Sequence, residues 1–448
     1  APFKSIKTGG LVWRSPQQLS KLVVAFPGEM ERRKTRRVGA MRGGKLEFVP
    51  REEVDLVIPN FENIFSPLAA FVPGKSGMKA QRMSMGSRMT TQALGLVNAE
   101  APLVRTGLVD AEGSFEERYA DKLGAVKTKT GGIVSSITPD YIEVTKDDGT
   151  KEKHELYNNY AYNRKSLIHN TPVVKHHQRV EPGQLLAKSN YTDDKGVSAL
   201  GVNLRTGYMN YKGLNFEDAV VISESAAKKL ASQHMYQNQL DISPDHKVGK
   251  KAYWGIFPTK YNKAQLDTLD DDGVIKPGTV VKDGDPLVLA AKRNEPSQGK
   301  VHKRGQSSFA DATVAWDHHN EGVVTDVFKS DKSYMVFVKS NNEMVQADKI
   351  SGLYGDKGIV SRIIPDDQMP LDESGKPLEV LVNELGVISR GNPIQVVAAV
   401  LGKIAAKTGK HYDLHDFNTI SDLVLFAKKE AQKHGVKDLE DVTDPETG

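Results

Sequence analysis

The sequence predicts a β-rich, multidomain protein of the α+β class. Short runs rich in valine and isoleucine, bounded by glycine, proline and aspartate, recur along most of the chain, whereas apolar residues at clear helical spacing occur in one long segment, 391–410. The length of 448 residues is enough for two to four domains, each with its own core. Residues 240–345 are more polar than their surroundings, which predicts an insertion that protrudes from the body.

The overall composition is that of an ordinary soluble protein. Hydrophobic residues make up 38% and charged residues 26%, and no apolar stretch approaches the ~20 residues of a membrane span. The amino terminus does not have the charged-then-apolar pattern of a signal peptide. The absence of cysteine excludes disulfides, thiolate zinc sites and a cysteine nucleophile. We therefore expect a cytoplasmic protein with no membrane partner.

Charge is unevenly distributed along the chain. Residues 1–50 contain 11 Lys or Arg against 3 Asp or Glu, a balance of +8, whereas residues 411–448 contain 4 against 9, a balance of −5. The basic end includes a run formed by Arg32, Arg33, Lys34, Arg36 and Arg37. Such a run either binds a polyanion or is a solvated loop, and the sequence leaves both interpretations open.

The segment 53–73 is expected to form a short strand and then a short helix, with Ser66 as its cap and Pro67 at its first position. The residues that follow contain no acid and four cationic side chains: Lys75, Lys79, Arg82 and Arg88. Without local acidic partners, these side chains are expected to face water, another chain or phosphates. Gly-Lys-Ser at 74–76 is not a P-loop, because Ala69 stands where the first glycine would be.

Residues 125–200 have the pattern of strands and turns. The stretch 131–156 predicts a hairpin with Asp147, Asp148 and Gly149 in its turn. Two further stretches, 178–189 and 278–293, resemble each other as strand, glycine turn and strand, which suggests a sandwich-type barrel element used twice.

The clearest helix is expected within 391–410. Asn392 is placed to cap it, Pro393 stands at its first position and Gly409 at its end. The apolar residues in between recur at helical spacing, so one face is expected to pack on a sheet or on another helix.

A glycine-rich loop precedes a strand at 351–365. Gly352, Gly355 and Gly358 allow tight turns and close approach to a ligand. Lys349 and Lys357 border the glycines and are suited to act as point charges for phosphate. Turns alone would also explain the glycines, but two lysines beside one loop favour an anion-binding role.

Glu217 and Asp218 form an acidic pair before a β-branched run. A surface turn or a helix cap would explain them, and on one strand adjacent side chains point to opposite faces, so they are not expected to share a proton. A role beside a hydrated Mg²⁺ ion fits two carboxylates better. The histidine pairs 176–177 and 318–319 do not have metal-ligand spacing, and the aspartates at 270–272 and 283–285 have the pattern of solvated turns.

Four blocks, taken in sequence order, resemble the second-largest (β) subunit of multisubunit DNA-dependent RNA polymerases. They are EVDLVIPNFENIFSPLAAFVPGKSGMKAQRMSMGSRMTTQAL, EAPLVRTG, GVNLRTGYMNYKGLNFEDAVVISES and ADKISGLYGDKGIVSRIIPDDQMPLDESGKPLEVLVNELGVISRGNPIQ. The strongest parts are GLNFEDAVVISE and the lysine-bearing glycine loop that runs into MPLDESGKPLEVLVNELGVISR. The order of four blocks carries more weight than any one of them.

The resemblance implies a double-psi β-barrel core with a barrel or sandwich-type insertion and flanking helices. It divides the chain into a fork and hybrid-lining basic region at 1–95, a β-rich connecting domain at 96–165, the first half of the barrel at 166–240, a flap-like insertion at 241–345, the second half of the barrel at 346–392 and a helical C-terminal region at 393–448.

The resemblance also implies roles for individual residues. Glu217 and Asp218 would support the second Mg²⁺ ion, which arrives with the nucleotide.

 The support for the second ion would run through water, and the first ion would be held by a partner chain. Lys349 and Lys357 would contact the RNA 3′ region and the substrate phosphates, and Arg390 would lie near the triphosphate. The remaining site residues are Arg82, on the same substrate-facing path, and Arg88 and Gln92, in the block that lines the RNA–DNA hybrid.

The sequence also departs from the family pattern. It contains no Asp-x-Asp-x-Asp block of the kind that holds the first Mg²⁺ ion in the largest subunit. We therefore expect an enzyme that is active only in complex, with β′-like and β N-terminal-like chains, a DNA template, the RNA–DNA hybrid and NTPs as partners. The split and divergent pattern resembles the polymerases of giant bacteriophages, which implies a location in the host cytoplasm or the virion.

A second interpretation stays open. A non-catalytic RNA- or ribosome-binding protein with β-barrel domains would also have a basic end that binds a nucleic-acid backbone by counterion release.

Overall fold

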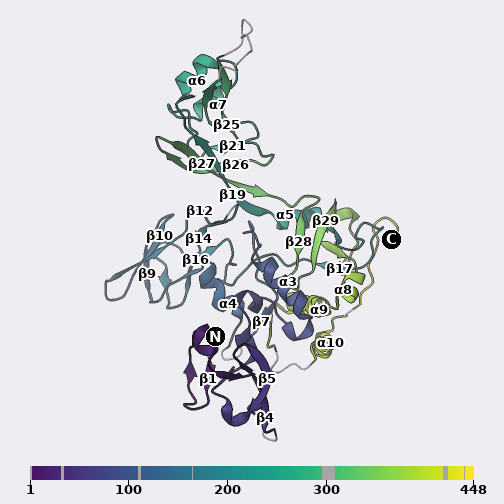
Figure 1. The fold of residues 1–448 in the computed structure, drawn as a ribbon. Helices are drawn as coiled ribbons and strands as arrows, with labels where there is room; N and C mark the ends of the chain where they lie inside the picture. The colour runs from purple at the N-terminus through teal and green to yellow at the C-terminus, as the bar shows by residue number, and fades with distance from the viewer. Residues whose placement is uncertain are drawn as a thin grey trace, which may run out of the picture.

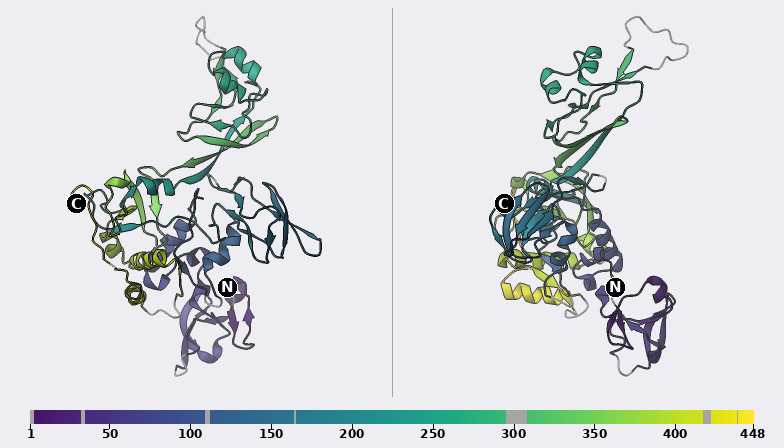
Figure 2. Two further views of the ribbon diagram at one scale, coloured as in Figure 1. Left: turned by 180° about the vertical axis from the view of Figure 1, so that it is seen from behind. Right: turned by 90° about the vertical axis from the view of Figure 1, so that its left-hand side faces the viewer.

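The computed structural model describes residues 3–31, 35–108, 112–163, 165–294, 308–416, 422–437 and 439–448. The chain forms a central body with two projecting parts, an N-terminal sheet domain on one side and an arm on the other (Figure 1). The views in Figure 2 show the same arrangement from behind and from the side. Arg32, Arg33 and Lys34 of the basic run lie outside the described residues.

The N-terminal domain is a six-stranded sheet with strand order β2-β1-β6-β3-β4-β5. Its core lies on the face to which Val23, Ala25, Val38 and Ala40 point, at the two-residue spacing of a half-buried sheet. The elements are β1 (Phe3–Ser5), β2 (Leu11–Val12), α1 (Pro16–Leu19), β3 (Val23–Ala25), β4 (Arg37–Arg42), β5 (Lys45–Pro50), the 3₁₀ turn η1 (Arg51–Glu53) and β6 (Leu56–Val57).

Short helices connect this domain to the body: η2 (Phe61–Ile64), α2 (Pro67–Ala70), η3 (Lys75–Gly77) and α3 (Ala80–Thr90). The predicted cap of α2 is confirmed, because the hydroxyl of Ser66 accepts a hydrogen bond from the N–H of Ala69 at 3.3 Å.

The expectation that Lys75 faces water, another chain or phosphates is wrong. Its side chain is buried, with the residue 4% exposed, and its Nζ lies 2.9 Å from Oδ2 of Asp416, which is itself 2% exposed. No local pattern indicates this partner, because Asp416 follows more than three hundred residues later. The ion pair joins the loop before α3 to the C-terminal part of the chain.

The connecting region contains small antiparallel sheets. One has the order β11-β10-β9-β15 and another β14-β16-β8. The predicted turn at 147–149 is confirmed, since it joins β10 to β11. The elements are β7 (Val104–Thr106), α4 (Phe115–Tyr119), η4 (Ala120–Leu123), β8 (Val126–Lys127), β9 (Gly132–Ile137), β10 (Tyr141–Thr145), β11 (Lys151–Glu155), β12 (Tyr160–Ala161), β13 (Leu167–Ile168), β14 (Asn170–Pro172), β15 (Arg179–Val180) and β16 (Leu185–Ser189).

The arm begins with β19 and returns with β27, which pair in antiparallel register along all ten residues of each strand. Although its sequence is polar, the arm has its own core, in which Tyr253, Leu289 and Trp316 are fully buried. The elements are β19 (Ser232–Asp241), β20 (His246–Val248), α6 (Lys250–Ile256), α7 (Lys263–Asp267), β21 (Val280–Val281), β22 (Pro286–Val288), β23 (Ala290–Arg293), β24 (Phe309–Asp311), β25 (Val314–Ala315), β26 (Gly322–Lys329) and β27 (Ser333–Asn342).

The two stretches that resemble each other in sequence also resemble each other in structure. In 178–189 the glycine turn joins β15 to β16, and in 278–293 it joins β21 to β22. In both cases the two strands belong to different sheets, so the chain changes sheet at the turn.

The body is built on a mixed five-stranded sheet with the order β17-β30-β18-β29-β28. Strands β17 and β30 are parallel, as are β18 and β29, and β18 runs antiparallel to β30. The elements are β17 (Thr206–Tyr208), β18 (Ala219–Ser223), α5 (Glu224–Lys229), β28 (Lys349–Ser351), β29 (Lys357–Ile364), η5 (Asp366–Gln368) and β30 (Val380–Val382).

The C-terminal part packs two helices together beside this sheet. Its elements are α8 (Leu385–Arg390), α9 (Ile394–Thr408), β31 (Tyr412–Leu414) and α10 (Leu423–His434). The predicted helix is confirmed as α9, which ends at Gly409. The prediction that Asn392 caps α9 is wrong, because no side-chain cap is formed and the amide of Asn392 donates to the carbonyl of Tyr354 at 2.9 Å. Among the described residues, no helix has the length and apolar character needed to cross a membrane.

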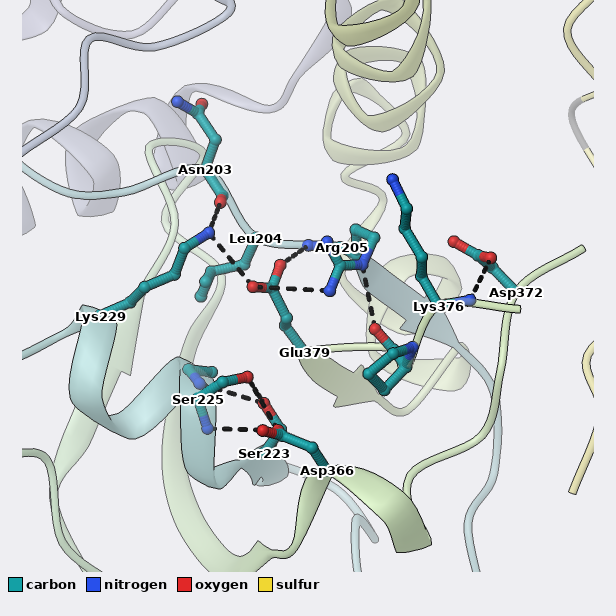
Figure 3. Close-up of polar contacts among 12 residues, drawn as sticks. Asn203, Leu204, Arg205, Ser223, Ser225, Lys229, Asp366, Asp372, Lys376 and Glu379 are labelled. Atoms are coloured by element: carbon teal, nitrogen blue, oxygen red, sulfur yellow. Dashed lines mark hydrogen bonds and ion pairs between the residues drawn. The ribbon is translucent and has the colours of Figure 1, made fainter. Parts of the chain in front are cut away.

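Buried polar contacts join the strands of the body, as Figure 3 shows. The carboxylate of Glu379, which is almost fully buried, accepts a hydrogen bond from the N–H of Arg205 at 2.8 Å and lies 3.1 Å from Nζ of Lys229. The Nζ of Lys229 also donates to the carbonyl of Asn203 at 3.3 Å. A buried carboxylate needs such partners, and these contacts fix α5 and β30 to the segment before β17.

A second buried carboxyl group lies between β7 and α4. Glu116 is 1% exposed, and both of its carboxyl oxygens accept from the N–H of Thr106, at 3.2 and 3.1 Å. Burial raises the pKa of Glu116 to about 8, although the hydrogen bond from Thr106 and the charge of Arg105 act in the opposite direction.

The raised pKa of Glu116 predicts a pH-dependent stability. The stability that the protonated carboxyl contributes is complete below its unfolded pKa of 4.5 and is lost as pH rises through about 8. We expect Glu116→Gln to match the wild type in melting temperature near pH 5 and to exceed it by several degrees at pH 8.5. Thermal unfolding of both proteins across this range measures the difference, with the exposed Glu181→Gln as control. A difference that stays constant with pH would contradict the prediction.

Candidate functional site

A cavity of about 230 Å³ opens where the central sheet meets α3, α8 and α9. Five of the eight candidate site residues line it: Arg82, Glu217, Asp218, Lys357 and Arg390. These residues come from four separate segments of the chain, so the fold brings them together. Lys349, Arg88 and Gln92 do not line this cavity.

The acidic pair precedes β18 rather than lying within it. Glu217 has a φ of +55°, in the left-handed region that residues other than glycine seldom adopt. The expectation that adjacent side chains would point to opposite faces of a strand is therefore wrong, and both carboxylates line the same cavity. The left-handed backbone at Glu217 is the local feature that breaks the two-residue alternation.

Asp218 forms an ion pair with the guanidinium of Arg390. Arg390 is the last residue of α8, and Gly391 ends that helix with a φ of +54°. Both side chains are partly exposed to solvent, so the pair contributes at most ~1 kcal/mol to stability. Its effect is to orient the arginine and one carboxylate at the mouth of the cavity.

The two lysines of the glycine loop lie on the hairpin formed by β28 and β29. Lys357 is opposite Ser351 and Lys349 is opposite Ile359, so the register places both lysines on the same face of the hairpin. Lys357 lines the cavity, whereas Lys349 is exposed on the edge strand. Within the described part of the chain, neither lysine forms an ion pair with an acidic side chain, which leaves both charges available to an anion.

Helix α3 packs directly against the hairpin loop. A Cβ on Gly86 would lie 2.4 Å from the carbonyl oxygen of Leu353, and a Cβ on Gly355, whose φ is +72°, would lie 2.6 Å from that of Arg82. The contact allows Nη1 of Arg82 to donate to the carbonyl of Gly355 at 3.0 Å. The glycines thus permit the backbone approach that places Arg82 in the cavity.

Arg88 and Gln92 lie elsewhere on this segment. Arg88 is in the last turn of α3 and Gln92 follows the helix, and both are exposed to solvent. Their expected contact with an RNA–DNA hybrid stays a prediction.

The cavity offers a limited set of metal ligands. No group of three or more His, Asp or Glu side chains suited to hold a metal ion occurs among the described residues. Glu217 and Asp218 provide carboxylate oxygens, which Mg²⁺ prefers, but Asp218 is already paired with Arg390. These residues fit a Mg²⁺ ion that keeps its waters and takes its other ligands from phosphates or another chain.

The cavity also contains residues that the sequence did not single out as functional. Asp356 lies inside the glycine loop, and Tyr208, Asn392 and Gln395 line the wall. The position of Asp356 directly before Lys357 was the one available signal. Asn392 and Gln395 belong to the predicted start of a helix, and nothing in that pattern marks them as cavity residues.

Comparison with known proteins identifies the family. The family model described as RNA polymerase Rpb2, domain 6, matches residues 127–448, which is more than half of the chain. The chain belongs to the RNA polymerase β-subunit family. Members of this family from three bacteria are similar to it over most of its length.

These relatives are all DNA-directed RNA polymerase β subunits. That of Streptomyces avermitilis is 30% identical over 406 residues, covering 83% of this chain and 33% of the relative. Those of Syntrophomonas wolfei and Rubrobacter xylanophilus are 30% and 31% identical, with 85% and 82% of this chain and 36% and 33% of the relative covered. The chain thus spans about a third of the length of the β subunits it matches.

The contact between α3 and the glycine hairpin gives a first prediction for the site. In Gly355→Ala the new methyl group would meet the backbone of Arg82, and alanine disfavours the φ of +72°. We expect a loss of about 2–4 kcal/mol in the free energy of unfolding. Chemical denaturation measures it, with Gly375→Ala as control, because Gly375 also has a positive φ but has open space around it. Equal losses of unfolding free energy in Gly355→Ala and Gly375→Ala would show that the close approach of the Arg82 backbone adds nothing to the cost of the substitution.

Proposed function

We propose that this chain is the C-terminal portion of a β-type subunit in a multisubunit DNA-directed RNA polymerase. In this role it contributes contacts to the NTP and to the RNA 3′ end during templated nucleotidyl transfer. The observation that carries the proposal is the convergence of Arg82, Lys357 and Arg390 with Glu217 and Asp218 on one cavity. Membership in the β-subunit family supports the same reaction.

The chemistry of the cavity suits phosphoryl transfer, in which catalysis consists mainly of positioning and charge stabilisation. Lys357 presents an ammonium group with no acidic partner among the described residues, and Arg82 and Arg390 present guanidinium groups. These cations bind the phosphates and hold them at the mouth of the cavity. Glu217 and Asp218 would hold, through its waters, a Mg²⁺ ion that accompanies the nucleotide.

A bound Mg²⁺ ion supplies neutralisation of the charge that develops on the phosphates. The first such ion is held by a β′-like partner chain in this proposal, and a β N-terminal-like chain completes the β subunit. The proposed double-psi barrel is supported by the two parallel strand pairs of the body, β17 with β30 and β18 with β29. Origin in a split polymerase of the giant-bacteriophage kind rests on the sequence resemblance alone.

The position of the two lysines predicts unequal effects in the assembled polymerase. Lys357→Ala removes a charge that lines the cavity, so we expect the KM for NTP to rise about 10- to 100-fold, as for loss of a charge-assisted hydrogen bond. Lys349→Ala, at the exposed edge strand, is expected to raise it less than about threefold. Steady-state elongation at varied NTP concentration measures both values. An unchanged KM in Lys357→Ala would contradict the assignment of the hairpin.

Substitution of the acidic pair distinguishes the two functional hypotheses, a polymerase subunit and a protein that only binds nucleic acid. We expect the double variant Glu217→Ala and Asp218→Ala to slow elongation at limiting NTP at least about tenfold while the affinity of the complex for template DNA stays within about twofold. Single-turnover nucleotide addition and DNA-binding titrations measure the two quantities. Glu181→Ala, in an exposed turn, is the matched control. Wild-type elongation by the double variant would remove the acidic pair from the proposed mechanism.

A further inference from the structure

Asp356 is half-buried in the glycine hairpin. A Cβ on Gly352 would lie 2.5 Å from its Oδ2, so the carboxylate folds back over the backbone of that glycine. Its Oδ1 is buried and has no hydrogen-bond partner among the described residues. The side chain also lines the cavity that contains Lys357 and Arg82.

The charges that line the cavity balance one another. Three side chains are cationic, Arg82, Lys357 and Arg390, and three are acidic, Glu217, Asp218 and Asp356. With all six ionised, their sum is 3 − 3 = 0. A site for a polyanionic triphosphate gains attraction when one acidic charge is removed. Asp356 is the least exposed of these three acidic residues.

Asp356 differs from the other two carboxylates in its surroundings. Glu217 and Asp218 are exposed, and Asp218 is paired with Arg390. Burial raises the pKa of Asp356 to about 6, although backbone N–H groups of the loop and the charge of Arg82 lower it in part. Its carboxyl group therefore changes charge close to neutral pH, where it affects the balance of the cavity.

Two tyrosines beside Asp356 do not change charge in this range. Burial and the charge of Asp356 raise the pKa of Tyr208 on β17 and of Tyr354 in the loop, so both stay neutral. The charged groups that face the cavity are Arg82 from α3, Glu217 and Asp218 before β18, Lys357 from β29 and Arg390 from α8.

We propose that Asp356 is a charge-setting residue: its carboxylate, enclosed in the hairpin between Arg82 and Lys357, determines how strongly the cavity attracts the phosphates of a nucleotide. It does not contact the phosphates but acts on them through the net charge of the cavity. When it is ionised the six charges cancel, and when it is protonated the cavity carries one net positive charge. The inference rests on the proposed function, because it assumes that phosphates bind at this cavity.

The test compares wild type with Asp356→Asn in the assembled polymerase. The amide has the shape of the carboxylate but no charge, so the ratio of the wild-type KM for NTP to that of the variant isolates the charge. We expect this ratio to be about three to ten at pH 8 and to fall to about one near pH 5, with kcat alike in both. Protonation of the nucleotide itself cancels in the ratio.

A ratio that does not vary with pH would overturn the inference, because a purely structural effect of the amide has no reason to follow the carboxyl titration. Asp367→Asn, at an exposed aspartate of η5 that does not line the cavity, is the control and should give a ratio of about one at every pH. If Asp356→Asn does not assemble, Asp356→Ser provides a smaller neutral side chain for the same comparison.

A second measurement is independent of catalysis. Because the pKa of Asp356 is raised above its unfolded value of 3.8, the stability that the protonated form contributes is lost as pH rises through about 6. In the purified chain, the melting temperature of Asp356→Asn should therefore exceed that of the wild type increasingly between pH 5 and pH 8. An excess that is the same at both ends of this range would overturn the buried titration on which the inference depends.

The two proposals fail in different ways. If Lys357→Ala leaves the KM for NTP unchanged, phosphates do not bind at the cavity, and the proposed function fails together with the inference. If Lys357→Ala raises the KM but the ratio for Asp356→Asn stays flat with pH, the proposed function stands and only the charge-setting role of Asp356 is overturned.

Discussion

The parallel pairing of β18 with β29 is the constraint on which the candidate site depends. Ala219 is in register with Ile359, and the N–H of Ile359 donates to the carbonyl of Asp218 at 2.9 Å. The pairing therefore sets the acidic pair next to the start of β29, where Lys357 lies. A slip of one residue would move the lysine by about 3.3 Å along the strand and turn its side chain to the other face of the sheet. The geometry of the cavity is thus fixed by backbone hydrogen bonds rather than by the partly exposed ion pair at its mouth.

This pairing joins strands that are separated by the whole arm, so its entropic cost would be large if the intervening chain were disordered. The arm reduces that cost because it folds on a core of its own and brings its two ends together in the ten-residue ladder of β19 and β27. Strand β19 follows α5 and β18, and β27 leads to β28. The ladder therefore brings the two halves of the central sheet together as a short connection would.

The sequence was informative where structure is decided locally. The Ser66 cap, the turn at 147–149 and helix α9 follow from short-range preferences, and all three are confirmed. The sequence was misleading where contacts between distant segments determine the conformation. The left-handed backbone at Glu217 breaks the alternation expected of a strand, and the buried partner of Lys75 comes from the far end of the chain. The enclosure of Asp356 depends on packing that no local pattern records. The resemblance located five cavity residues because it carries information about tertiary structure that spacing alone lacks.

Lys75 and Lys357 differ in whether the fold gives their charge a partner. Lys75 follows a glycine in a basic segment, and Lys357 precedes a glycine in the glycine-rich loop. Lys75 is buried with Asp416, and its Nζ also donates to the carbonyl of Val72, so its charge is fully satisfied within the chain. Removing either partner would leave a buried charge unpaired, which costs several kcal/mol, and the pair is therefore committed to the fold. Lys357 is half-buried and lines the cavity, and among the described residues it forms no ion pair with an acidic side chain. An unpaired charge beside a cavity is available to bind an anion. A buried, paired charge such as that of Lys75 instead stabilises the fold.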